Sequence, residues 1–334
     1  MSVNKKCYLH IGAPKTGSTA LQNFLCVNFQ KLADYGWQYP DVSLRGFGHH
    51  DLAFLVAEGY PEWAIPQERS LSELVDKLQA TVAGCSQIIL SSENFYLFPN
   101  PGKIGEILHY VGFPPETVKI VVYVRRQDEA HISWYNQAIK AQGYSGTISQ
   151  CIQDNLDLWN YHLQLEKWAQ VFGVSNIIVR PYEKEKLTDG DVRRDFLKIL
   201  DIPQTNLIIP DKMVNTRLNS DILDFQRIIN QLPLSSKEKR SFHKELIELT
   251  SCSKKTNIFD DKPLLSFKQC NEIILRYSES NRKVAEAYIN MEELFCDTFP
   301  DFNFQNKSPS KLTLEKIVLI LGWIMIKNKQ NTLP

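Results

Sequence analysis

YLHIGAPKTGSTALQNFL, residues 8–25, is the stretch from which the rest of the chain is interpreted. Apolar residues 7–11 predict a short strand, and apolar residues at helical spacing after Ser18 predict an amphipathic helix. Residues 12–17 form a tight loop between them. A loop that joins a buried strand to a helix N-terminus offers free backbone N–H groups and the positive end of the helix dipole. We therefore predict an anion-binding loop here.

The spacing of the glycines resembles that of a nucleoside-triphosphate P-loop. Gly12 and Gly17 stand where the two P-loop glycines would be, but Ser18 replaces the lysine that should follow the second one. The only lysine of the loop is Lys15, inside it. Because a Walker lysine is placed to reach β- and γ-phosphates, its displacement indicates a different anion. The alternative is an ordinary turn that carries a lysine by chance.

The composition is that of an ordinary globular protein, and it limits the kinds of partner that we expect. The 334 residues are 43% hydrophobic and 23% charged, with a net charge of zero. A neutral chain lacks the electrostatic footprint of a nucleic-acid binder, so we expect no nucleic-acid partner and only a local anion site. Seven scattered cysteines without a C-x-x-C pair predict a reducing compartment and no zinc site. With no room for a signal peptide before the first strand, we expect a cytoplasmic protein.

Alternating strands and helices predict an α/β fold. Residues 118–124 are almost all β-branched, which is typical of a central parallel strand buried on both faces. Strands and helices alternate to about residue 200, and only helices follow residue 219. We predict a P-loop-NTPase-like three-layer core with a central parallel sheet at 1–215 and a helical C-terminal extension packed on it at 216–334.

The C-terminal extension contains the most apolar run of the chain, residues 317–326. This run is shorter than the ~20 residues that a membrane span needs, so we expect no membrane span. Lys316 and Lys327 flank it. The simplest interpretation is a packed helix, and interfacial membrane contact is the alternative.

Two stretches together resemble the sulfotransferases that use 3′-phosphoadenosine-5′-phosphosulfate (PAPS). HIGAPKTGSTAL, residues 10–21, is similar to that family's 5′-phosphosulfate loop, whose pattern is P-K-[ST]-G-[ST]-T. VVYVRRQDEAHISWY, residues 121–135, is similar to its 3′-phosphate site, in which an arginine ends a strand and a serine follows eight residues later. The P-K-T-G-S-T form of the first stretch and the Ser-Trp-Tyr after the arginine in the second are more similar to the bacterial and carbohydrate-type branch. The resemblance covers roughly residues 5–215.

The resemblance implies PAPS as the donor, held without a metal ion. The residues that it implies for donor binding are Lys15, Thr16, Gly17, Ser18, Thr19, Arg125, Ser133 and, in a late loop over the nucleotide, Arg217. A guanidinium can bind a phosphate through two hydrogen bonds. No acidic residue follows strand 118–124, where a Mg²⁺-binding aspartate would be expected. For Arg125 the alternative is a surface salt bridge.

The implied reaction transfers a sulfuryl group in line to an acceptor hydroxyl or amine, with Lys15 as a catalytic cation and a Glu or His as general base. Glu93 follows the second core strand, near the position of the histidine in the small-molecule branch. His50, in the loop after the first helix, is the second candidate, as in carbohydrate-type members. Glu93 could instead cap a turn or pair with Arg125, and His50 could cap the next helix.

The expected acceptor is a glycan or another hydroxylated small molecule. Trp37, Tyr39, Trp134 and Tyr135 could stack on a sugar ring or belong to the core. Two other functions stay open. A P-loop kinase or nucleotidase would need Mg²⁺ and ATP, and the missing Walker residues count against it. A non-catalytic nucleotide-binding module would keep the loop without the chemistry.

Overall fold

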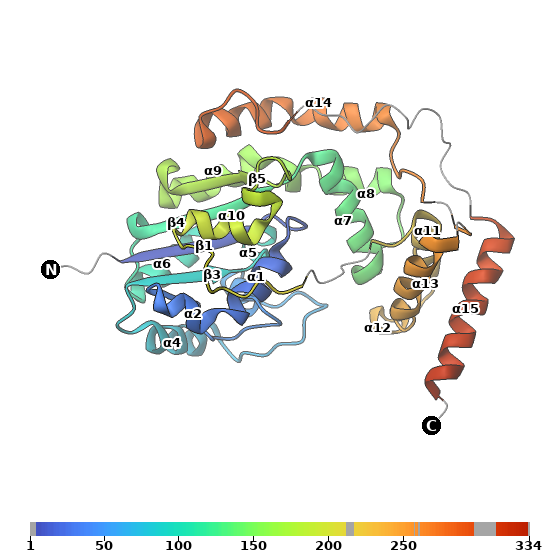
Figure 1. Ribbon diagram of the computed structural model, residues 1–334, viewed down its shortest axis with the longest axis horizontal. Coiled ribbons are helices and arrows are strands. Elements are labelled where there is room, and N and C mark those ends of the chain that lie inside the picture. Colours follow the sequence, from blue (N-terminus) through green and yellow to red (C-terminus); the bar gives the residue numbers. More distant parts are fainter. Residues whose placement is uncertain (1–4, 212–216, 257, 260, 297–311, 333–334) are drawn as a thin grey trace. The chain divides into compact units, whose positions relative to one another are not determined.

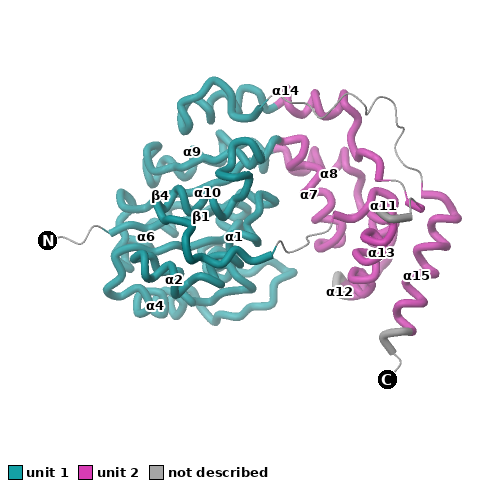
Figure 2. The backbone as a smooth tube through the Cα atoms, in the orientation of Figure 1, with its two compact units in different colours: residues 1–126, 157–213, 277–297 teal, residues 127–156, 214–276, 298–334 magenta. Residues whose placement is uncertain are grey.

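The computed structural model describes residues 5–211, 217–256, 258–259, 261–296 and 312–332. Figure 2 shows two compact units. Unit 1 comprises residues 1–126, 157–213 and 277–297, and unit 2 comprises residues 127–156, 214–276 and 298–334. Each unit is made of three separate segments of the chain. The sequence instead predicts two consecutive domains with one boundary, near residue 215.

Unit 1 is built on a five-stranded parallel sheet of order β2-β3-β1-β4-β5 (Figure 1). The strands are β1 (Lys6–Gly12), β2 (Trp37–Gln38), β3 (Gln87–Ser91), β4 (Val118–Val124) and β5 (Ile177–Pro181). β1 lies in the middle and pairs with β3 on one side and β4 on the other. The predicted α/β class with a central parallel sheet is confirmed. The two-residue edge strand β2 is too short to give a periodic signal, and the sequence analysis missed it.

Helices alternate with these strands and cover the sheet. They are α1 (Ser18–Val27), α2 (Phe29–Asp34), α3 (His50–Val56), α4 (Leu71–Val82), α5 (Asn94–Leu97), α6 (Pro101–Tyr110), α9 (Tyr161–Phe172) and α10 (Val192–Ile199). Four 3₁₀ turns join them, at Pro115–Thr117, Asp157–Trp159, Val174–Asn176 and Thr188–Gly190. Ser70 caps α4, because its hydroxyl accepts the Glu73 N–H at 3.2 Å.

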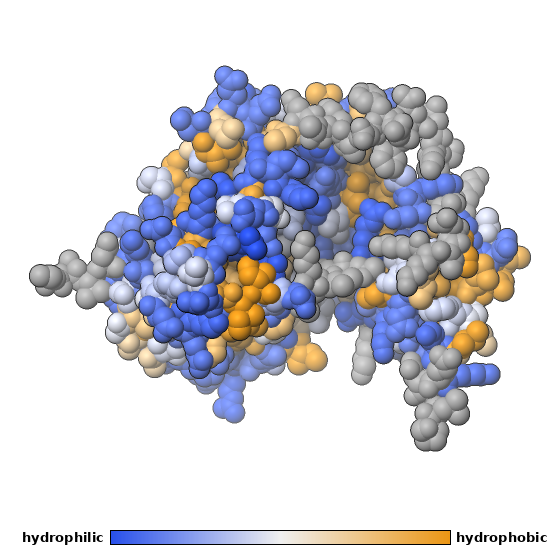
Figure 3. Space-filling model, in the orientation of Figure 1, coloured by the Kyte–Doolittle hydropathy of each residue, from blue (hydrophilic) through white to orange (hydrophobic). Residues whose placement is uncertain are grey.

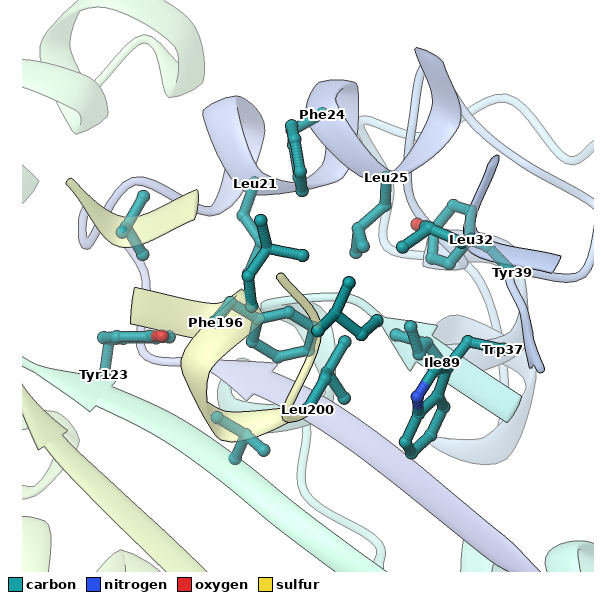
Figure 4. Packing of buried hydrophobic residues seen from close by; sticks show 14 of the residues in the cluster. Leu21, Phe24, Leu25, Leu32, Trp37, Tyr39, Ile89, Tyr123, Phe196 and Leu200 are labelled. Carbon is teal, nitrogen blue, oxygen red and sulfur yellow. The ribbon is translucent and has the colours of Figure 1, made fainter. Parts of the chain in front are cut away.

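The core under α1 fixes where the anion loop lies. Leu21 and Phe24 of α1 pack with Phe196 of α10 over Ile89 and Tyr123 of the sheet (Figure 4). All five side chains are fully buried. Burying each of the leucine, isoleucine and phenylalanine side chains stabilises the fold by about 1.5–3 kcal/mol. This packing holds the first turn of α1 against the carboxyl end of β1.

Unit 2 is helical in the part that the structure describes. Its helices are α7 (Gln127–Gln142), α8 (Ile148–Asp154), α11 (Ser220–Ile229), α12 (Ser236–Lys239), α13 (His243–Thr256), α14 (Phe267–Val284) as far as residue 276, and α15 (Leu314–Thr332). The rest of α14 and the π-helical turn Ala285–Ile289 belong to unit 1. Leu218, Ile222, Leu246, Ile320 and Ile324 share one core.

Apolar residues at helical spacing predict one helix at 156–172 and one at 235–249, and the structure differs from both. The single helix expected at 235–249 is two helices, α12 and α13, separated by a turn. The helix expected at 156–172 begins only at Tyr161, because Asn160 caps it by accepting the Leu163 N–H at 3.2 Å. In both cases helical periodicity runs through a local break that the apolar pattern does not reveal.

Candidate active site

The anion loop has a backbone that favours glycine at both ends. Gly12 and Gly17 have φ angles of +112° and +83°, and Lys15 between them has +65°. A Cβ on Gly12 would lie 3.1 Å from the Cβ of Glu93, so only glycine allows the loop to approach this residue so closely. Inside the loop the Thr16 hydroxyl donates to the Ala13 carbonyl at 2.6 Å. The Thr16 hydroxyl thus holds the loop's own shape.

The first turn of α1 is suited to an anion. Gly17 is its N-cap and supplies no side-chain hydrogen bond, and the turn contains no acidic residue. The Ser18 hydroxyl is buried and has no hydrogen-bond partner among the described residues. The Thr19 side chain is exposed. An uncapped helix N-terminus leaves backbone N–H groups unsatisfied, and an anion satisfies them.

Arg125 lies beside this loop. It directly follows β4, and its guanidinium Nη1 donates to the Lys15 carbonyl at 3.3 Å. The guanidinium also lies over the Tyr182 ring, 5.7 Å from its centroid. Its backbone is held by Tyr161, whose hydroxyl donates to the Arg125 carbonyl at 2.5 Å. Lys15 of the first stretch and Arg125 of the second therefore meet at the carboxyl edge of β1 and β4.

Tyr182 joins the loop to Arg125, and the sequence analysis did not propose it for the site. A Cβ on Gly17 would lie 3.1 Å from both the ring and the hydroxyl of Tyr182. The Tyr182 N–H donates to the Val124 carbonyl at 2.7 Å, which fixes the residue after β5. Burial raises the pKa of its phenol, and the Arg125 charge opposes this rise. A Pro-Tyr after a short strand carries no recognised signal.

Glu93 reaches the same edge from β3. Its carboxylate Oε2 accepts a hydrogen bond from Gln22 Nε2 at 2.8 Å. Gln22 lies on the apolar side of α1 and is buried there, although its side chain is polar. A polar residue on an apolar helix stripe is a signal that the sequence carries for Gln22. Glu93 is the residue before α5, but its side chain makes no capping hydrogen bond.

His50 begins α3 and lies near Gln22. Its Nδ1 is 2.7 Å from the Ser92 hydroxyl and 2.9 Å from Asn94 Nδ2. A Cβ on Gly48 would lie 2.8 Å from His50 Nε2 and 2.9 Å from Gln22 Cδ. The structure therefore brings both candidate bases to one cluster, centred on Gln22.

Two further histidines stand behind this cluster. His10 Nδ1 is 2.7 Å from the Ser91 hydroxyl, and His49 Nδ1 accepts the Ser91 N–H at 3.1 Å. Burial lowers the pKa of each ring to about 4, and the Glu93 charge partly opposes this for His10. Both rings are therefore neutral at pH 7. His49 Nε2 then donates to the Pro40 carbonyl at 2.9 Å.

The remaining predicted donor residues lie in unit 2. Ser133 is on α7, six residues after the start of that helix. Arg217 donates to Asp261 at 2.9 Å, and both side chains are about half exposed. The residues before it, 212–216, lie outside the described residues. Binding of the donor's 3′-phosphate by Ser133, and a place for Arg217 in a loop over the nucleotide, stay predictions.

Among the predicted sugar-stacking residues, Trp37 and Tyr39 belong to the core of unit 1. Both are almost fully buried, at 4% and 2% exposure. Tyr135 is buried in the core of unit 2, and Trp134 packs against that core and donates to Asn155 at 3.1 Å. Because Trp37, Tyr39 and Tyr135 are buried, a packing role is favoured for these three residues.

The described residues offer no candidate for a membrane span or for a metal site. None of the helices there is long and apolar enough to cross a membrane. No group of three or more His, Cys, Asp or Glu side chains in those same ranges could hold a metal ion.

Comparisons with known proteins give a distant relationship. No protein-family model matches the chain. An uncharacterised protein of Archaeoglobus fulgidus is 30% identical over 219 residues, which are 65% of this chain and 58% of that protein. The match thus spans less than two thirds of the relative's length. Two solved structures align at 14% identity and a TM-score of 0.42, a sulfotransferase from Alicyclobacillus acidocaldarius and a sulfotransferase domain from the curacin biosynthetic pathway. The alignments cover 77% and 82% of this chain and 97% of each structure.

Proposed function

We propose that this protein is a sulfotransferase that moves a sulfuryl group from PAPS to a hydroxyl of a glycan or another small acceptor. The observation that carries the proposal is the contact between Arg125 Nη1 and the Lys15 carbonyl. It places a guanidinium, a lysine and an uncapped helix N-terminus at one edge of the sheet. A donor with a 5′-phosphosulfate and a 3′-phosphate needs more than one cationic group within reach.

The donor's 5′-phosphosulfate is assigned to the loop. Backbone N–H groups at the start of α1 and the Ser18 hydroxyl would donate to it, and the Lys15 ammonium would neutralise its charge. Arg125 is assigned to the 3′-phosphate, and the resemblance of the sequence implies Ser133 for the same phosphate. The exchange of the Walker aspartate for an arginine after β4 favours a nucleotide held without Mg²⁺.

In the proposed reaction the acceptor oxygen attacks sulfur while the bond from sulfur to the bridging phosphate oxygen breaks. The acceptor proton passes to a general base, and adenosine 3′,5′-bisphosphate leaves. Negative charge develops on the bridging oxygen, where Lys15 and the loop N–H groups stabilise it. Because the packing of α1 holds the loop N–H groups in place before the substrate arrives, they need little rearrangement during the step.

We propose Glu93 as the base in preference to His50. The Cβ of Glu93 lies against the Gly12 position at the start of the anion loop, and one carboxylate oxygen is held by Gln22. His50 contacts Ser92 and Asn94 through Nδ1, and its Nε2 packs near Gly48 and Gln22. This packing favours a positioning role for His50 in the cluster.

The test is transfer of radiolabelled sulfate from PAPS to a panel of acceptors that includes neutral and acidic oligosaccharides, sugar amines and phenols. Label on any acceptor, with release of the bisphosphate, supports the proposal. Binding of the bisphosphate without transfer to any acceptor would favour a non-catalytic module. Phosphate transfer from Mg-ATP would favour a kinase.

A further inference from the structure

Helix α15 has an apolar surface on both sides. Its inner side packs into the core of unit 2, where Ile320 and Ile324 are buried. Trp323 fixes this side by donating from Nε1 to the Glu245 carbonyl at 3.1 Å. Lys316 pairs with Asp221 at 2.6 Å on the same side. The docked face of the helix is therefore defined.

The outer side carries five residues that we call the outer face: Val318, Leu319, Gly322, Met325 and Ile326. The four side chains are 59%, 44%, 64% and 60% exposed. They recur at intervals of one, three and four residues, which places them on one stripe of a helix. Figure 3 shows apolar side chains gathered over α15. A contiguous exposed apolar stripe of this kind marks an interaction surface.

Gly322 is at the centre of the outer face. A Cβ built on it would meet no atom within 4 Å, so the glycine is not required by packing inside unit 2. In mid-helix it costs about 1 kcal/mol relative to alanine. A glycine at the middle of an apolar face lets a second helix approach closely, which offsets that cost.

The charges at the two ends of the outer face identify the partner. Glu315 and Lys329 each lie seven residues from Gly322, on opposite sides and on the same stripe. Both side chains are exposed. Seven residues are nearly two turns, or ~10 Å. If a second α15 crosses antiparallel with Gly322 over Gly322, Glu315 of each copy therefore lies opposite Lys329 of the other.

We propose that the outer face of α15 pairs with the same face of a second copy of this chain, antiparallel about a two-fold axis at Gly322. Such an isologous contact joins Val318 to Ile326 and Leu319 to Met325. A lipid surface fits less well, because Lys316 and Lys327 are paired with Asp221 and Glu248 of unit 2, and Glu315 lies at the edge of the outer face. The contact is small, and we expect a weak dimer.

The test is sedimentation equilibrium of the full chain from low to high micromolar concentration. The wild type should form dimers. Val318→Glu and Met325→Glu should each weaken dimerisation more than ~tenfold, because a charge is buried in an apolar contact. Ile65→Glu is the control, since Ile65 is 80% exposed in unit 1 and lies outside this face. Circular dichroism checks that the variants fold.

A charge exchange tests the antiparallel geometry directly. Glu315→Lys and Lys329→Glu should each weaken the dimer, and the double variant should restore it, because each copy then again faces an opposite charge. A wild type that is monomeric throughout, or a dimer unaffected by either apolar substitution, would overturn the proposal. Monomers that bind vesicles of phosphatidylcholine and phosphatidylserine through this face would assign it to lipid instead. None of these outcomes depends on the proposed enzymatic activity.

Discussion

Lys15 combines a charged side chain with a backbone that favours glycine. Its φ of +65° places a non-glycine residue in the left-handed region, at a cost of about 1 kcal/mol. The carbonyl of this residue also accepts a hydrogen bond from the Arg125 guanidinium. Strain of this kind persists where the surrounding structure and function fix the residue. Substitutions at this position can therefore test the backbone strain and the side-chain charge separately.

We predict that Lys15→Ala and Lys15→Gly both lose most sulfuryl transfer, by ~10²-fold or more, because the charge on the leaving oxygen is no longer stabilised. The glycine variant should be the more stable of the two, since it relieves the left-handed strain. Transfer rates and denaturant unfolding measure the two effects separately. Lys103→Ala, on the exposed side of α6, is the control. Either Lys15 variant with full activity would contradict the assigned role.

Glu93 and His50 can be told apart by conservative variants. Glu93→Gln keeps the shape and a hydrogen bond to Gln22 but cannot take a proton, so we expect kcat to fall by ~10²–10⁴-fold. His50→Asn should lower kcat less, with a larger share of the effect in KM for the acceptor. Rates at saturating PAPS measure both. The reverse order of kcat losses would make His50 the base.

At the scale of elements, the site depends on how two strand ends and one helix N-terminus pack. Gly17 is the N-cap of α1 and lies against Tyr182 after β5, and Tyr182 lies under Arg125 after β4. A substitution at one of these three residues should therefore shift the positions of the other two.

Gly17→Ala tests this coupling, with Gly84→Ala as a matched control. The two glycines have φ angles of +83° and +81°, but a Cβ on Gly84 would meet no atom within 4 Å. Both variants should lose about 1–2 kcal/mol for the left-handed backbone. Only Gly17→Ala should lose more, and only it should weaken binding of adenosine 3′,5′-bisphosphate. Unfolding and calorimetry measure these effects, and equal losses in both variants would count against the Tyr182 contact.

The elements with a strong periodic signal could be predicted, and those fixed by single contacts could not. β1, β4 and α1 follow from apolar runs and from the loop between them, so the sheet and the edge that carries the loop were predictable. The roles of Gln22 and Tyr182 depend on contacts between segments far apart in the chain. The approach of Arg125 to the Lys15 carbonyl is likewise a matter of three-dimensional packing.

At the scale of the whole molecule, buried neutral histidines make stability depend on pH. His10 and His49 have pKa values of about 4 in the folded chain, against 6.5 ordinarily, because burial disfavours the charged ring. Between these values the unfolded chain binds protons that the folded chain does not. Their contribution is therefore complete above pH 6.5 and is lost as the pH falls towards 4.

We predict that the free energy of unfolding falls over this range by up to about 1.4 kcal/mol per pH unit for each histidine. Denaturant titrations at a series of pH values measure it. His10→Asn should reduce the slope, because asparagine can keep a hydrogen bond to Ser91 without titrating. His109→Asn, an exposed residue of α6, should leave the slope unchanged. A slope that is the same in all three proteins would refute the role of His10.

The most direct test of the account is a metal-free calorimetric titration with adenosine 3′,5′-bisphosphate and, in parallel, adenosine 5′-monophosphate. The wild type should prefer the bisphosphate by ~10–100-fold, since charge-assisted hydrogen bonds from Arg125 to a 3′-phosphate contribute about 1.5–3 kcal/mol. Arg125→Ala should remove that preference and keep most of the affinity for the monophosphate. Equal affinity of the wild type for both nucleotides, or binding only of Mg-ATP, would contradict the account.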